Sequence, residues 1–66
     1  MDEFKIGDKF AFAGVVMTVL VWDRTGMRTV YRDLNGVLHN FTFSAAQFPH
    51  VKKQIRGYAN YLKRQG

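Results

Sequence analysis

Cysteine is absent from this chain, so neither a disulfide nor a thiolate zinc site is possible. Long apolar runs are absent too. The longest, residues 15–22, is interrupted by Thr18 and is far too short to cross a bilayer. The start of the chain, with Asp2 and Glu3, lacks the positive end and the apolar segment of a signal peptide. We therefore expect a cytoplasmic protein with no membrane partner, stabilised by apolar packing alone.

Carboxylates are missing from residues 34–66. Residues 1–33 carry five basic and five acidic groups, which sum to zero, so the net charge of +5 comes entirely from the second half. That excess consists of Lys52, Lys53, Arg56, Lys63 and Arg64. This asymmetry favours an anionic partner, although a net charge also serves to keep a small domain soluble.

The groups that catalysis requires are also few. The only histidines, His39 and His50, lie in the half without carboxylates, so we expect no acid–base pair to converge. No zinc-protease, nucleophile-elbow or phosphate-loop motif occurs. Because His39 alternates with apolar residues, we expect it to be partly buried and bonded to the backbone, and we expect His50 to be exposed. The chain is predicted not to be an enzyme and to need no cofactor or metal.

What the chain does contain is apolar material, 47% of its 66 residues, which suits one small β-rich domain. Alternating and β-branched segments predict a meander of strands over residues 6–44. Residues 15–22 are apolar on both faces, which predicts a strand buried on both sides. We expect Gly26 to adopt a positive φ in the turn that follows. Further turns are predicted at Ala13-Gly14 and at Asn35-Gly36.

A helix is predicted to close the domain. Ser44 to Gln47 matches a capping box, so we expect a turn at residues 45–48 and an amphipathic helix over residues 49–64, beginning near Pro49. The predicted apolar stripe of this helix is Val51, Ile55, Tyr58 and Leu62. The aromatic residues expected in the core are Trp22, Phe10, Phe12, Phe41 and Phe43.

The segment Gly7-Asp8-Lys9-Phe10-Ala11-Phe12-Ala13-Gly14 resembles the opening of a KOW-type barrel, with a Gly-Asp pair, alternating apolar residues and a glycine at the first turn. Over residues 6–44 the chain is similar to the SH3-like small barrels, which include KOW and Tudor domains and the C-terminal domain of retroviral integrases. The resemblance implies a mainly β fold, an antiparallel barrel or half-barrel of four to five strands with a C-terminal α-helix. It also implies binding of RNA, DNA or peptides. An open sheet with the helix on its face is the alternative.

The basic helix is the predicted nucleic-acid site, because Lys52, Lys53, Arg56, Lys63 and Arg64 can all contact phosphates. Arg28 and Arg32 share one strand face and can extend this basic surface, or they can pair with the neighbouring Asp23 and Asp33. Four aromatic residues are candidates for stacking on bases, and of these Tyr61 lies off the helix stripe and is expected to be the most exposed. The others are Tyr31, Tyr58 and Trp22.

The sequence thus predicts a small, non-enzymatic DNA- or RNA-binding domain that holds phosphates through its C-terminal helix. The alternative is a protein-interaction module, such as a small phage- or plasmid-type regulator. Such a module would dock on an acidic surface of a larger host protein or add a strand to its sheet. A monomer or a weak homodimer through Val51, Ile55 and Tyr58 is compatible with both.

Overall fold

The computed structural model describes residues 4–65 and contains one sheet and one long helix. Four antiparallel strands form a sheet in chain order: β1 (Lys9–Phe12), β2 (Val15–Trp22), β3 (Gly26–Arg32) and β4 (Leu38–Ser44). The short 3₁₀ turn η1 (Ala45–Gln47) then leads into α1 (Phe48–Gln65). The expected mainly β class, with four antiparallel strands and a C-terminal helix, is confirmed.

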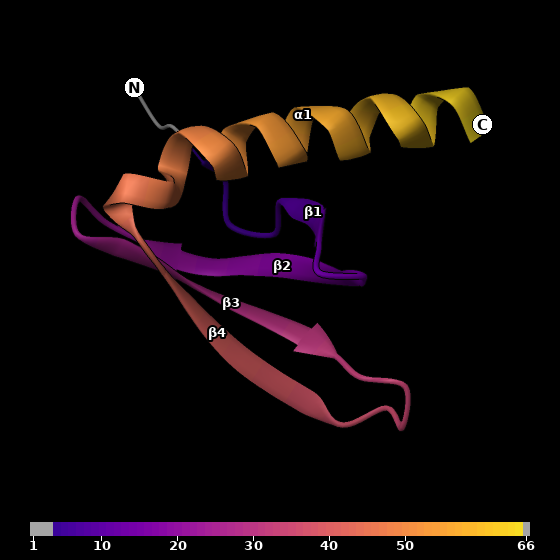
Figure 1. The fold of residues 1–66 in the computed structure, drawn as a ribbon, viewed down its shortest axis with the longest axis horizontal. Coiled ribbons are helices and arrows are strands. Elements are labelled where there is room, and N and C mark those ends of the chain that lie inside the picture. Colours follow the sequence, from indigo (N-terminus) through magenta and orange to yellow (C-terminus); the bar gives the residue numbers. More distant parts are fainter. Residues whose placement is uncertain (1–3, 66) are drawn as a thin grey trace.

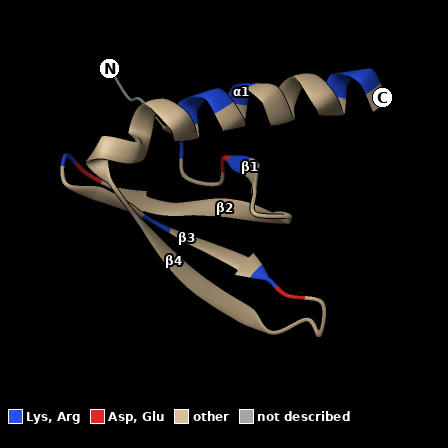
Figure 2. Cartoon of the chain, in the orientation of Figure 1, with Lys and Arg blue, Asp and Glu red and all other residues tan. Residues whose placement is uncertain are grey.

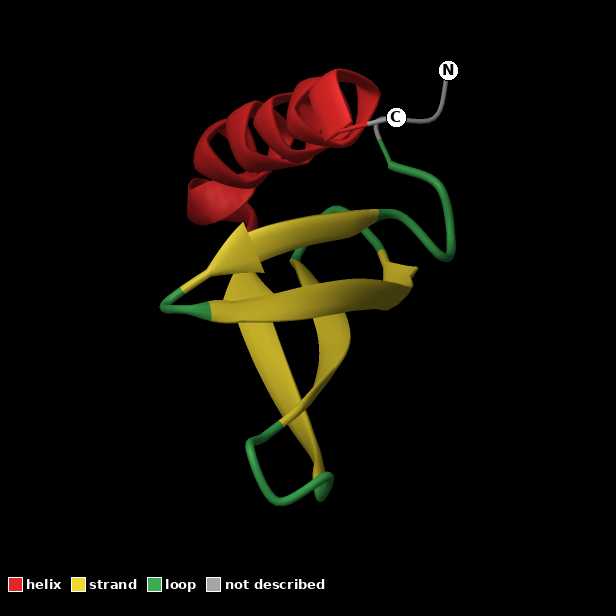
Figure 3. Cartoon of the chain, turned by 90° about the vertical axis from the view of Figure 1, so that its right-hand side faces the viewer, coloured by secondary structure: helices red, strands yellow, loops and turns green. Residues whose placement is uncertain are grey.

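The sheet is open, with β1 and β4 at its two edges. Figure 1 shows α1 running above β1 and β2, while the β3–β4 hairpin extends away from the helix. Seen from the side, the helix lies on one side of the sheet (Figure 3). The arrangement is therefore two layers, in which the helix covers only part of one sheet face.

The core lies between the first turns of α1 and this sheet face. Its buried members are Phe4, Phe10, Met17, Val19, Met27, Phe43, Phe48 and Val51. Trp22 packs against this cluster and donates its indole N–H to the Phe4 carbonyl at 3.0 Å. The buried Thr29 hydroxyl likewise donates to the Phe41 carbonyl at 2.8 Å, so burial leaves neither polar group unpaired.

Strand β2 departs from the prediction, because only one of its faces is buried. A bulge between Val19 and Val21 places Val19 opposite Thr29 and Val21 opposite Arg28. The extra residue, Leu20, shifts the alternation, so Trp22 joins the core side with Met17 and Val19. Leu20 and Val21 are left 40% and 52% exposed. The bulge thus moves Trp22 to the core side of β2, and the apolar residues on the other face of the strand stay partly exposed.

The turns follow local chemistry with one exception. Ala13 and Gly14 join β1 to β2 with φ values of 51° and 83°, and Gly36 has a φ of 81°. Gly26 does not adopt the positive φ that the sequence predicted. A β-carbon there would lie 2.6 Å from the carbonyl oxygen of Phe43, so the glycine is needed because β4 passes so close.

The helix begins as the sequence predicted. The backbone N–H of Ser44 donates to Oε1 of Gln47 at 3.0 Å, which fixes η1 before α1 starts. The predicted apolar stripe is buried only at its N-terminal end. Val51 is fully buried and Ile55 packs on the core, whereas Leu62 is 48% exposed. Leu62, the last member of the predicted stripe, is therefore not part of the core.

Candidate nucleic-acid interface

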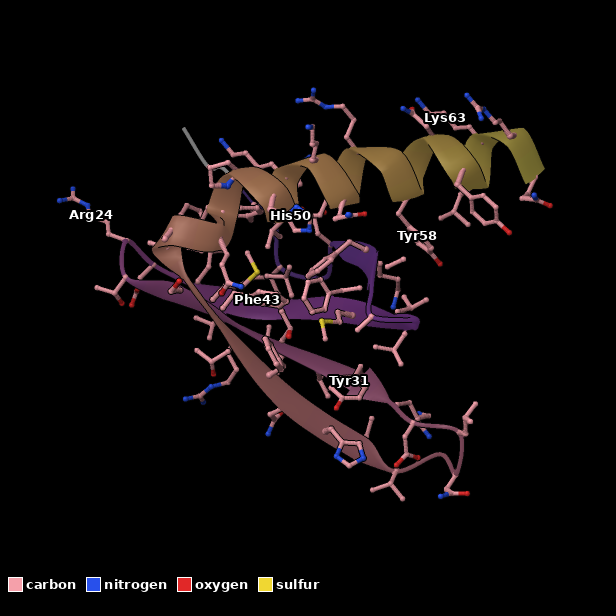
Figure 4. The ribbon with its side chains drawn as sticks, viewed as in Figure 1. Arg24, Tyr31, Phe43, His50, Tyr58 and Lys63 are labelled. Atoms are coloured by element: carbon pink, nitrogen blue, oxygen red, sulfur yellow. The ribbon has the colours of Figure 1, made fainter. Side chains whose placement is uncertain are left out.

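The cations of α1 lie on the side of the helix that faces away from the sheet. Figure 2 shows the blue basic segments along the helix, and Figure 4 shows Lys63 projecting away from the sheet. Lys52, Lys53, Arg56, Lys63 and Arg64 are all exposed, and no carboxylate occurs in the helix. Within residues 4–65, Lys53, Arg56, Lys63 and Arg64 form no ion pair. The outer helix face, defined by these four residues and Lys52, is therefore a strongly positive surface.

Arg28 and Arg32 lie on the opposite side of the sheet. Met27 and Thr29, which pair with Phe43 and Phe41, point into the core side, so Arg28 and Arg32 point away from the helix. The structure thus does not join these arginines to the outer helix face, and a single ligand strand cannot follow both surfaces in a straight path.

The two acidic residues beside these arginines bind the backbone of their own turns. Asp23 Oδ1 accepts from the N–H of Thr25 at 2.8 Å and of Gly26 at 3.1 Å, and also from the Thr25 hydroxyl at 2.6 Å. The Thr25 hydroxyl, followed by these N–H groups, lowers the pKa of Asp23. Local ion pairing with arginine, the alternative considered for this group, does not occur among the described residues.

His39 forms a pair with a carboxylate, so the expectation that no histidine and carboxylate would converge was wrong. Its Nε2–H donates to Asp33 Oδ2 at 2.7 Å, and its ring stacks on Tyr31 with centroids 5.2 Å apart. The bond to His39, followed by the N–H of Val37, lowers the pKa of Asp33. The side chain of His39 is 42% exposed and bonds a carboxylate, so the expected burial and backbone bond were wrong. The Asn35-Gly36 turn, which folds β4 back on β3, is the signal that could have placed the two residues together.

Exposed aromatic rings gather beside the helix and on the uncovered part of the sheet. Tyr61 is 55% exposed, as expected, and stacks with Tyr58 at 6.3 Å and an interplanar angle of 27°. Phe41 is 39% exposed although it was expected in the core, because α1 does not extend over that part of β4. Trp22 packs into the core instead of presenting its ring to a ligand.

A shallow pocket of about 280 Å³ opens between β1 and the second half of α1. It is lined by Ala11, Gln54, Gly57, Tyr58 and Tyr61. In Figure 4 Tyr58 points from the helix towards the sheet. In this pocket exposed aromatic surface adjoins the basic helix, and sequence periodicity alone did not indicate it.

Among the described residues, no three or more His, Cys, Asp or Glu side chains are grouped so as to hold a metal ion. None of the described helices has the length and apolar character needed to span a membrane. Comparisons with protein-family models, with curated proteins and with solved structures found no match.

Proposed function

We propose that this protein binds nucleic acid through the outer face of α1, where basic side chains contact the phosphate backbone. The observation that carries the proposal is a helix whose exposed face bears several cations and no carboxylate. An ordinary solvated helix face mixes both signs, since pairs at i, i+4 stabilise it. Such pairs cannot form within α1, because it has no carboxylate. Four of its cations, Lys53, Arg56, Lys63 and Arg64, form no ion pair within residues 4–65 and are available to an anionic polymer.

Binding of this kind depends mainly on charge and hardly on base sequence. Each phosphate that is neutralised releases condensed counterions. If four or five cations of α1 each contact a phosphate, the logarithm of the affinity should fall with the logarithm of salt concentration with a slope of about −3 to −4.5.

The proposal is tested by fluorescence anisotropy with labelled single- and double-stranded oligonucleotides at two salt concentrations. The helix variant replaces Lys53, Arg56 and Lys63 by glutamine. Its matched control replaces Arg24, Arg28 and Arg32 by glutamine, which removes the same charge from other surfaces. We expect the helix variant to lose binding and the control to retain most of it, with circular dichroism showing that both fold.

An equal loss in the two variants would mean that net charge alone attracts the ligand, and the assignment to α1 would be wrong. Absence of binding by the parent protein at low salt would eliminate the proposed function.

One observation favours a protein partner as the second candidate. In the described part of the chain β4 has no neighbour on its outer edge, and it carries no charged Lys, Arg, Asp or Glu. Exposed edge strands usually carry such charges or a proline to prevent pairing. An added strand from a partner would satisfy this edge, and co-purification of a protein with the parent but not with Asn40→Pro would support that mode.

A further inference from the structure

Gly57 lies in the middle of α1, where glycine is unfavourable to a helix. A β-carbon at this position would meet no atom within 4 Å among the described residues. Gly57 differs in this respect from Gly26, where the backbone of β4 leaves no room for a side chain. The fold itself therefore does not need a glycine at position 57. Without a side chain there, the helix backbone is accessible to a ligand.

The residues around Gly57 indicate which kind of ligand would fit there. The pocket between β1 and α1 is lined by two small residues, Gly57 and Ala11, and by two aromatic residues, Tyr58 and Tyr61. Their rings are nearly parallel, at 27°, and Tyr61 is more than half exposed. Gln54 adds an amide to the lining. A flat aromatic face with a polar group beside it suits a planar heterocycle such as a nucleobase.

Cations flank this pocket on the helix. Lys53, Gly57, Tyr61 and Arg64 follow one another at i, i+4, i+8 and i+11, so they share one side of α1. Lys53 and Arg64 are exposed and form no ion pair within residues 4–65. A base in the pocket would thus have a cation on either side of it along the helix. Within a strand each nucleotide has a phosphate on either side, so this arrangement matches the position of the phosphates.

We propose that the pocket of Ala11, Gln54, Gly57, Tyr58 and Tyr61 receives an unstacked base of single-stranded nucleic acid, stacked on Tyr61, while Lys53 and Arg64 contact the adjacent phosphates. This inference rests on the proposed function and specifies the ligand as single-stranded nucleic acid. A duplex buries its base faces in its own stack, so only a single strand can offer one to the pocket. The protein should therefore prefer single strands to duplexes of equal length.

The test uses three labelled probes of equal length: single-stranded oligo-dT, the same strand with abasic sites, and a duplex. Tyr61→Ala removes the stacking ring, and Tyr61→Phe is its control because it keeps the ring. Gly57→Leu fills the pocket, and Ala59→Leu introduces the same side chain beside Ile55 and Leu62, outside this pocket.

We expect Tyr61→Ala to weaken oligo-dT binding by about 5- to 100-fold, the effect of one lost base–aromatic stack. Tyr61→Phe and Ala59→Leu should bind like the parent. Gly57→Leu should weaken binding as Tyr61→Ala does, and yet raise the melting temperature by about 4–8 °C, because leucine is the better helix former. The abasic probe should bind the parent and Tyr61→Ala with equal affinity.

The outcomes separate the two proposals. If the Lys53, Arg56 and Lys63 variant loses binding while Tyr61→Ala and Gly57→Leu retain it, the proposed function stands and the base pocket is wrong. An equal loss on the abasic and normal strands in Tyr61→Ala also overturns the pocket, because no base would then be involved. If the parent binds none of the probes at low salt, both proposals fail.

Discussion

The two halves of α1 carry the same apolar stripe but meet different surroundings. At the N-terminal half, Phe48 and Val51 are buried against the sheet, and Phe48 packs edge-on against Phe4 with centroids 5.0 Å apart. At the C-terminal half, the stripe residue Leu62 remains about half exposed, and so does Tyr61 beside the stripe. The sheet causes the difference, because the last turns of α1 extend beyond it and the β3–β4 hairpin turns away from the helix (Figure 1). The N-terminal half of the helix is thus anchored in the core, and the C-terminal half leaves an apolar and an aromatic side chain largely exposed.

The strongest test of this division compares a buried ring with an exposed side chain. Phe43 is fully buried and lies 5.7 Å from Phe10 and 5.1 Å from Phe12 between ring centroids. We expect Phe43→Ala to lower the free energy of unfolding by about 3–5 kcal/mol, since it removes the ring and leaves a cavity. Leu62→Ala should cost less than about 1 kcal/mol. Urea denaturation measures both, and comparable losses would show that Leu62 is packed as tightly as a core residue.

The glycines sharpen the same comparison. Gly26→Ala places a β-carbon 2.6 Å from the Phe43 carbonyl oxygen, so a strand must shift, and we expect a loss of about 1–3 kcal/mol. Gly57→Ala meets nothing and should stabilise the protein by about 1 kcal/mol. Thermal unfolding of the two variants should therefore move in opposite directions. A loss of stability in Gly57→Ala would mean that the fold needs this glycine, and the inference drawn from it would be weakened.

A smaller gain is expected at the β1–β2 turn. Ala13 has a φ of 51°, a left-handed conformation that disfavours residues with an ordinary side chain. Asparagine tolerates this conformation, and Asn-Gly is the preferred pair where both turn residues need positive φ. We expect Ala13→Asn to raise the free energy of unfolding by up to about 1 kcal/mol. Ala46→Asn, on the exposed side of η1, is the control in which no such gain should occur.

The smallest expected effect is a pH dependence that arises at the hairpin turns. Hydrogen bonds to the folded state lower the pKa of Asp23 and Asp33 below the ordinary value of 3.8. The unfolded chain therefore binds more protons in acid. Their contribution to stability is complete above pH 3.8 and is lost as the pH falls through the lower folded pKa. The contribution is small because both carboxylates are exposed to solvent.

Urea denaturation from about pH 6 to pH 2 measures this dependence. Asp33→Asn keeps the oxygen that accepts from the N–H groups of Asn35 and Val37 but cannot titrate. We expect a shallower loss of stability in acid for this variant than for the parent. The same curve in both proteins would show that Asp33 contributes no pH dependence.

Features set by near neighbours in the chain were predictable from the sequence. The Ala13-Gly14 turn, the left-handed Gly36 and the start of the helix after Ser44 all follow from local backbone chemistry. The candidate site was predictable only in part. The cations of α1 were identified, and the exposure of Tyr61 was expected. The pocket beside Gly57 was not foreseen, because it requires β1 and α1 to be placed against each other.

The sequence by itself determined the order of the elements, the basic and apolar faces of the helix and the concentration of charge in the second half, because these depend on residues a few positions apart. Only the tertiary structure decided where the helix stops covering the sheet. It also set the bulge at Leu20 and the separation of Arg28 and Arg32 from the helix cations. Each of these depends on strand register and on the direction in which the layers cross, which are fixed by packing between distant segments.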